Sequence, residues 1–174
     1  RKVIDRAGWS LTAPAPWTTE TPDQHTLAQA LLTPTRIYVR PLLDVLKGPA
    51  GPALKALAHI TGGGLTENIP RVLPDHCAAA IDLAALTPAP VFGALASAGG
   101  IAEDEMLRTF NCGVGMVCVV AASAADEIAE QLRSAGEQVT VIGTLIHRSD
   151  LNDPQVQYSG ASTFALASAG SNAQ

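Results

Sequence analysis

The stretch HITGGGLTENIPR, residues 59–71, starts like the end of an apolar strand, passes through three consecutive glycines and finishes as a polar, helix-like turn. Glycine has no Cβ, so such a run permits positive φ angles and lets a ligand approach the bare backbone amides. Amides in this setting, followed by a helix start, favour a phosphate. The alternative is a tight turn between strand and helix that binds nothing. Pro70 lacks an N–H and restricts Ile69, so the helical turn is predicted to be short.

The composition is that of a folded chain that can bury a core. Its 174 residues suit one domain, and 47% of them are hydrophobic against 16% charged. A net charge of -5 gives no electrostatic footprint for nucleic acid or acidic membranes, so we expect neither as a partner. The first six residues lack a signal-peptide core, and the longest apolar run, residues 114–125, is shorter than the roughly 20 residues that span a bilayer. We therefore expect a soluble, cytoplasmic protein.

The cysteines do not indicate a metal or redox site. Cys77, Cys112 and Cys118 are odd in number and lack C-x-x-C spacing. In a reducing compartment they are expected to pack as small hydrophobic residues. No basic neighbour in sequence would lower the pKa of Cys112, so we interpret it as a packing residue rather than a nucleophile. No metal site is predicted.

Local patterns predict helices and strands in alternation. Thr26 fits a capping box before a helix that ends at Pro34, and Ser123 is predicted to cap a helix that ends at Gly136. Further helices are predicted at residues 1–7, 41–47, 91–98 and 103–108. Strands are predicted to begin near Ala58 and to cover residues 77–82, 114–120 and 139–146, with the apolar 114–120 covered on both faces. Strand, helix and strand with short connections favour an α+β (α/β-like) fold in which helices cover a sheet.

Three stretches together are far more specific than the glycines alone. They are LLTPTRIYV at residues 31–39, AHITGGGLTENIPRVLP at 58–74 and MLRTFNCGVGM at 106–116. In this order and spacing they closely resemble phosphoribosylformylglycinamidine cyclo-ligase, also called aminoimidazole ribonucleotide synthetase. The resemblance covers about residues 1–158 and corresponds to the C-terminal domain of that enzyme.

The resemblance implies a domain with a mixed β-sheet covered by helices, and a larger enzyme around it. In the family, an N-terminal domain carries most of the ATP site and the main contacts of the homodimer, and nothing in this sequence matches it. Residues 159–174, rich in Gly, Ala and Ser, depart from the family pattern and are expected to form a disordered tail. ATP and Mg²⁺ are implied as cofactors of the full-length enzyme, with none tightly bound to this chain. The chain alone is expected to be inactive.

The implied reaction closes the imidazole ring of formylglycinamidine ribonucleotide to give aminoimidazole ribonucleotide in purine synthesis. His59 is a candidate proton carrier or phosphate donor, although a histidine at a strand end is also a common structural residue. Arg36 is a candidate phosphate ligand, with a salt bridge that ties its segment to the domain as the alternative. The other candidates for substrate or phosphate binding are Thr61, Gly62, Gly63, Gly64, Glu67, Asn68, Asn111 and Gly113.

Two other functions remain open at this point. A phosphate-binding or assembly domain without catalysis would fit a chain that lacks the ATP-binding half. A related ATP-using enzyme, such as a selenophosphate synthetase or thiamine phosphate kinase, would share the architecture. The stretch TFNCGVGM at residues 109–116 favours the cyclo-ligase over those relatives.

Overall fold

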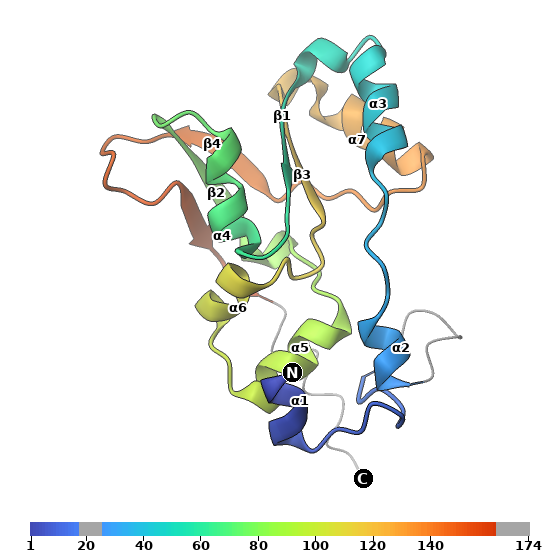
Figure 1. Ribbon diagram of the computed structural model, residues 1–174. Helices are drawn as coiled ribbons and strands as arrows, with labels where there is room; N and C mark the ends of the chain where they lie inside the picture. Colours follow the sequence, from blue (N-terminus) through green and yellow to red (C-terminus); the bar gives the residue numbers. More distant parts are fainter. Residues whose placement is uncertain (18–25, 163–174) are drawn as a thin grey trace.

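A computed structural model describes residues 1–17 and 26–162 (Figure 1). The helices are α1 (Lys2–Ala7), α2 (Leu27–Leu31), α3 (Val39–Lys47), α4 (Gly64–Asn68), α5 (Pro90–Gly99), α6 (Glu103–Thr109) and α7 (Ala125–Ser134). The strands are β1 (Leu54–His59), β2 (Cys77–Asp82), β3 (Met116–Val120), β4 (Gly143–His147) and β5 (Val156–Ser159). Residues 163–174 of the predicted tail lie outside the described residues, and its first residue, Ser159, ends β5.

Strands β1 and β3 form an antiparallel ribbon that lies between two hydrophobic cores. Their register places His59 opposite Met116 and Leu57 opposite Cys118. Alternate side chains of the ribbon enter different cores: Ala58 belongs to the core beside α4 and α6, and Leu57 packs on the core beside α3 and α7. In β3, Val117 and Val119 pack on the first core and Met116 and Cys118 on the second. Both faces of β3 are therefore covered, as its continuous apolar sequence predicts.

The second sheet has the strand order β4-β2-β5, with β2 antiparallel to β4 and parallel to β5. This sheet is mixed, and the fold is α+β, as expected. Strand β2 matches its predicted range. Strand β4 begins at Gly143 instead of near residue 139, and β5 was not predicted at all.

The helices divide between the two cores (Figure 1). Helices α3 and α7 pack on one another and against one face of the β1–β3 ribbon, where Leu42, Val45, Ile128 and Leu132 are buried. Helices α4 and α6 lie together on the other side, and α1 packs against α5. Local signals explain several of the helix ends. Thr26 forms the predicted capping box, and Gly8 and Gly100 close α1 and α5 in the left-handed conformation.

Two local predictions were wrong. Ser123 does not cap α7, because it lies inside a 3-10 turn (Ala122–Ala124) and the N-cap is Ala124, which has no capping side chain. Strand β1 begins at Leu54 and not near Ala58. Its alanines are weak strand formers by themselves, and pairing with the valine-rich β3 extends the strand, so tertiary contact overrides local propensity.

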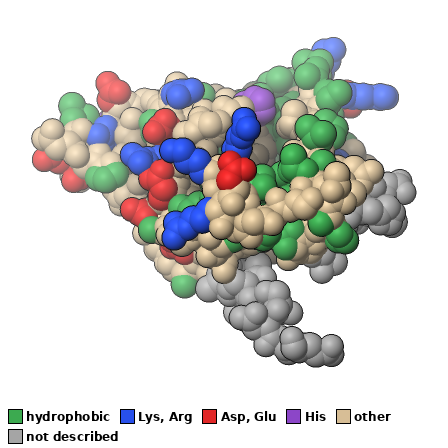
Figure 2. Space-filling model, turned by 60° about the horizontal axis from the view of Figure 1, so that its bottom comes forward, with side chains coloured by type: hydrophobic (Ala, Val, Ile, Leu, Met, Phe, Trp, Pro, Cys, Tyr) green, Lys and Arg blue, Asp and Glu red, His purple; other side chains and the backbone are tan. Residues whose placement is uncertain are grey.

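Among the described residues, no helix is both long enough and apolar enough to cross a bilayer. Figure 2 shows a face on which Lys and Arg side chains are interspersed with Asp and Glu. That face offers no continuous basic surface of the kind that binds nucleic acid.

Candidate functional site

The glycine loop follows directly after β1. The amide of Ile60 donates to the carbonyl of Gly115 at 3.0 Å, which holds the end of β1 against the start of β3. The amide of Gly64 then donates back to the carbonyl of Thr61 at 3.0 Å, so the chain reverses in a tight turn. Gly63 has a φ of 97° and Gly64 a φ of 56°, which L-residues with a side chain rarely adopt.

The three glycines differ in their surroundings. Gly62 is exposed, and a Cβ added there would meet no atom within 4 Å. Gly64 is buried, and its Cβ would overlap the backbone carbonyls of Leu107 and Phe110. Within the described part of the chain, the amides of Gly62 and Gly63 donate to no backbone or side-chain oxygen. The loop thus presents two free donors beside a fixed third glycine.

Asn68 holds this loop from inside. Its side chain is buried, with 4% exposed, and its amide nitrogen donates to the carbonyls of Gly62 at 3.2 Å and Gly64 at 2.8 Å. The predicted contact of Asn68 with a substrate stays a prediction, whereas its support of the loop is directly visible. A side chain that satisfies two carbonyls of one turn restricts the directions of the neighbouring N–H groups.

Glu67 places a carboxylate beside the same loop. Its backbone amide donates to the carbonyl of Gly63 at 3.0 Å, and its side chain lies so close that a Cβ on Gly63 would come within 2.7 Å of Oε2. Glu67 is exposed. A carboxylate at this place accepts hydrogen bonds from N–H groups and opposes an anion in direct contact with it.

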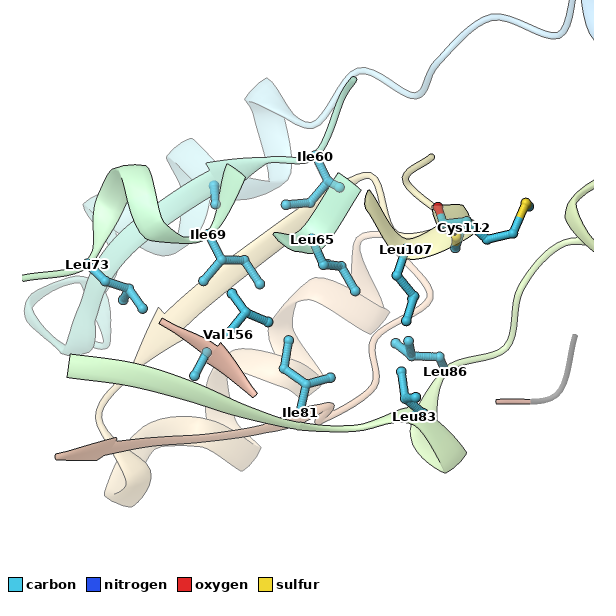
Figure 3. Close-up of a cluster of buried hydrophobic side chains, with 13 residues drawn as sticks. Ile60, Leu65, Ile69, Leu73, Ile81, Leu83, Leu86, Leu107, Cys112 and Val156 are labelled. Atoms are coloured by element: carbon cyan, nitrogen blue, oxygen red, sulfur yellow. Dashed lines mark hydrogen bonds between the residues drawn. The ribbon is translucent and has the colours of Figure 1, made fainter. Parts of the chain in front are cut away.

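Helix α4 anchors the loop to the core. Leu65, on α4, and Ile69, the residue that follows α4, are buried and point toward Ile81 and Val156 (Figure 3). The side chain of Thr66 bonds the hydroxyl of Tyr158 at 2.8 Å, and burial raises the pKa of Tyr158. Sequence reasoning missed this link, because Tyr158 lies on the unpredicted strand β5.

The loop that contains Asn111, Cys112 and Gly113 lies next to the glycine loop, since Phe110 contacts Gly64. The side-chain oxygen of Asn111 accepts from the amide of Gly113 at 3.2 Å, so this side chain closes its own turn. Gly113 is exposed with a φ of 93°, and Cys112 has a φ of 51°. The substrate contacts predicted for Asn111 and Gly113 stay predictions.

Cys112 is a packing residue, as expected. Only 1% of it is exposed, and its thiol donates to the carbonyls of Met106 at 3.5 Å and Phe110 at 3.6 Å. Burial raises the pKa of Cys112 to about 12. The thiol is therefore protonated near neutral pH and is a poor nucleophile.

His59 lies at the last position of β1 with an exposed side chain. Its imidazole contacts the ring of Tyr38 edge to face, with centroids 6.3 Å apart and planes inclined by 65°. The Tyr38 ring in turn fills the space beside Gly115. The stretch at residues 31–39 thus meets the other two at the end of the ribbon. Tyr38 was not singled out from sequence, although it lies in a quoted motif.

Arg36 lies at a different place. Its Nε is 3.1 Å from a carboxylate oxygen of Glu137, and its Nη2 donates to the carbonyl of Gly136 at 2.9 Å. These contacts tie the extended segment to the end of α7, which is the alternative considered for this residue. A phosphate at Arg36 would compete with Glu137, and that role stays a prediction.

The described residues contain no group of three or more His, Cys, Asp or Glu side chains arranged to hold a metal ion. The family described as AIR synthase related protein, C-terminal domain, matches residues 4–152. This range includes all three converging stretches.

Proposed function

The chain belongs to the AIR synthase related protein family, whose C-terminal domain it matches, and we propose that it is the substrate-side part of an ATP-dependent cyclo-ligase. The reaction would be closure of the imidazole ring of formylglycinamidine ribonucleotide. One observation supports the cyclo-ligase in particular, beyond the family assignment. The stretches at residues 31–39, 58–74 and 106–116, which resemble the cyclo-ligase, meet at the end of the β1–β3 ribbon.

Ring closure must remove an amide oxygen, which is a poor leaving group. ATP supplies the phosphoryl group that converts this oxygen into a phosphate ester. The substrate's amine nitrogen then attacks the same carbon, the C–O bond breaks, phosphate leaves with the oxygen, and the nitrogen loses a proton. Such a site needs donors for phosphate oxygens and groups that position the nitrogen end.

The residues of this chain fit the substrate side of that chemistry. The free amides of Gly62 and Gly63, next to Thr61, would bind phosphate oxygens, and exposed His59 would accept the proton. The carboxylate of Glu67 would accept hydrogen bonds from substrate N–H groups, which matches its position better than contact with an anion.

The described residues do not fit a magnesium site, since no suitable cluster of side chains is present among them. We assign no step of this chain to Mg²⁺. The proposal places the metal and most of the ATP contacts on an N-terminal domain, which would also form the homodimer of the full-length enzyme.

Titration of the ¹⁵N-labelled chain with phosphate ligands, monitored by amide NMR shifts, tests this proposal. Formylglycinamidine ribonucleotide should shift the amides of residues 61–68 and bind more tightly than ribose 5-phosphate or thiamine phosphate. For ribose 5-phosphate we expect a millimolar Kd, about −4 kcal/mol, because the open loop is exposed to water. The chain alone should show no ATP-dependent ring closure.

Gly63→Val is the matched loss-of-site variant, because a β-branched side chain is strained at the φ of 97° and would meet the Glu67 side chain. Gly8→Val is the control that should bind normally, because it places the same side chain at a positive φ of 66° in open space at the end of α1, outside the loop. Equal affinity for all three phosphates would favour the second candidate, a phosphate-binding or assembly domain without catalysis. Tighter binding of thiamine phosphate, or shifts that survive Gly63→Val, would contradict the cyclo-ligase assignment.

A further inference from the structure

We propose that Tyr38 is a positioning residue that orients the imidazole of His59 at the start of the glycine loop. The space for its phenol ring exists because residue 115 is glycine. The role of His59 on a substrate rests on the proposed function. The contact between the two rings and the space at Gly115 do not depend on it.

The contact with His59 is geometrically specific. The ring centroids of Tyr38 and His59 are 6.3 Å apart and inclined by 65°, which is the edge-to-face arrangement that aromatic rings favour. His59 is exposed, and no hydrogen bond of its imidazole is found among the described residues. The edge-to-face contact with Tyr38 can therefore restrict the imidazole's rotation.

The position of the Tyr38 ring requires a glycine opposite it. An ideal Cβ on Gly115 would lie 2.6 Å from Cζ and 3.1 Å from Cε2 of Tyr38, and would overlap the hydroxyl oxygen. Gly115 has no positive φ that would require glycine for backbone reasons. Its carbonyl accepts the amide of Ile60, so the backbone there cannot withdraw without breaking the end of the ribbon.

The backbone of Tyr38 is also fixed. Tyr38 is the N-cap of α3, and its carbonyl accepts the amide of Leu42 at 3.2 Å. Leu42 is buried in the core beside α7. Two residues before Tyr38, Arg36 is bound to Glu137 and Gly136. The chain is thus fixed on both sides of Tyr38. The edge of its ring can therefore restrict an imidazole that makes no hydrogen bond within the described residues.

Three variants and one control test the proposal on this chain. Tyr38→Phe keeps the ring, Tyr38→Leu removes it, and Gly115→Ala occupies its space. Phe92→Leu is the control, because it removes another half-buried aromatic residue, paired with Phe110 at 6.0 Å in the other core. The readouts are the imidazole proton shifts of His59 in NMR spectra, the Kd for formylglycinamidine ribonucleotide and the urea midpoint.

Tyr38→Phe should leave the His59 shifts and the Kd unchanged. Tyr38→Leu should abolish the ring-current shift of His59 and weaken ligand binding about three- to tenfold, the scale of one aromatic pair. Gly115→Ala should act like Tyr38→Leu. If that variant does not fold, Tyr38→Leu decides alone. Phe92→Leu should lower the urea midpoint without moving the His59 shifts or the Kd.

The outcomes separate two kinds of failure. If the wild-type chain binds no ribonucleotide, the proposed function fails, and the claim that Tyr38 supports ligand binding through His59 fails with it. If the wild type binds but Tyr38→Leu leaves either the His59 shifts or the Kd unchanged, Tyr38 is only a packing residue. If Phe92→Leu weakens binding as much as Tyr38→Leu does, the effect is one of general stability, and the inference is overturned.

Discussion

Replacement of Asn68 by alanine removes the two hydrogen bonds that hold the glycine loop from inside. Each net hydrogen bond contributes about 0.5–1.5 kcal/mol, and a buried carbonyl left without a donor costs about 1–3 kcal/mol. No buried carbonyl is stranded in this variant, because the backbone amide of residue 68 still bonds the Gly64 carbonyl within α4 and Gly62 is exposed. We therefore expect Asn68→Ala to lower the free energy of unfolding by about 1–3 kcal/mol, the sum of two such bonds.

Asn68→Asp keeps the shape but changes the donor. When ionised, the introduced carboxyl can only accept, so it faces the carbonyls of Gly62 and Gly64 without a proton to share. When protonated, it can donate to one of them. Burial and these carbonyls should raise its pKa in the folded state above the unfolded value of about 3.9. Its stabilising contribution is then present below about pH 4 and is lost as pH rises through the folded pKa.

Urea unfolding followed by circular dichroism at pH 4 and pH 7 measures both effects. Relative to wild type, Asn68→Asp should be destabilised more at pH 7 than at pH 4, whereas the deficit of Asn68→Ala should be independent of pH. Asn152→Ala is the control, because the side chain of Asn152 is exposed and bonds only within its own turn. A loss below about 0.5 kcal/mol for Asn68→Ala, the range of ordinary surface substitutions, would refute the role assigned to Asn68.

Three further predictions concern Gly64, Cys112 and Tyr158. Gly64→Ala should lower the free energy of unfolding in urea by about 2–5 kcal/mol, because a Cβ there overlaps carbonyls at the end of α6 and the φ of 56° is strained. Gly62→Ala should cost little, and equal costs for the two variants would contradict the packing described. Because the pKa of Cys112 is raised in the folded state, its contribution to stability is complete below the unfolded pKa of about 9 and is lost as pH rises toward 12. Cys112→Ala should therefore flatten the decline of stability at alkaline pH, and an identical decline would show that other groups cause it. Tyr158→Phe removes a hydrogen bond to Thr66 and should cost about 1 kcal/mol by the same assay. Thr66→Val also removes a bond to the carbonyl of Leu107, so the double variant should lose more than Tyr158→Phe but less than the sum of the two single losses. Additive losses would exclude a shared bond.

The sequence predicts the loop well because its signals are local. Three glycines, a polar turn and Pro70 specify a short helix after a strand, and the structure has α4 (Gly64–Asn68) followed by a 3-10 turn (Pro70–Val72). The sequence does not reveal which glycine is needed for which reason. Gly62 has open space and Gly64 has none, and this difference depends on the end of α6, some 40 residues away.

The features that sequence reasoning missed depend on long-range pairing. Strand β5 is four residues long and pairs in parallel with β2, so neither its length nor a nearby hairpin turn marks it. Its Tyr158 could be suspected only from the alternating pattern of residues 155–159. The ion pair of Arg36 could not be predicted for the same reason, because its partner Glu137 is distant in sequence.

The order of the glycine loop comes mainly from groups packed behind it. Asn68 bonds two of its carbonyls, and the backbone at Leu107 and Phe110 leaves Gly64 no room to move. The free amides of Gly62 and Gly63 are therefore directed before any ligand arrives, so little ordering entropy remains to be lost on binding. Loosening Asn68 or Gly64 should then weaken anion binding as well as stability. The substitutions most harmful to the proposed site need not be those of charged residues, because the donors proposed there are backbone groups fixed by packing.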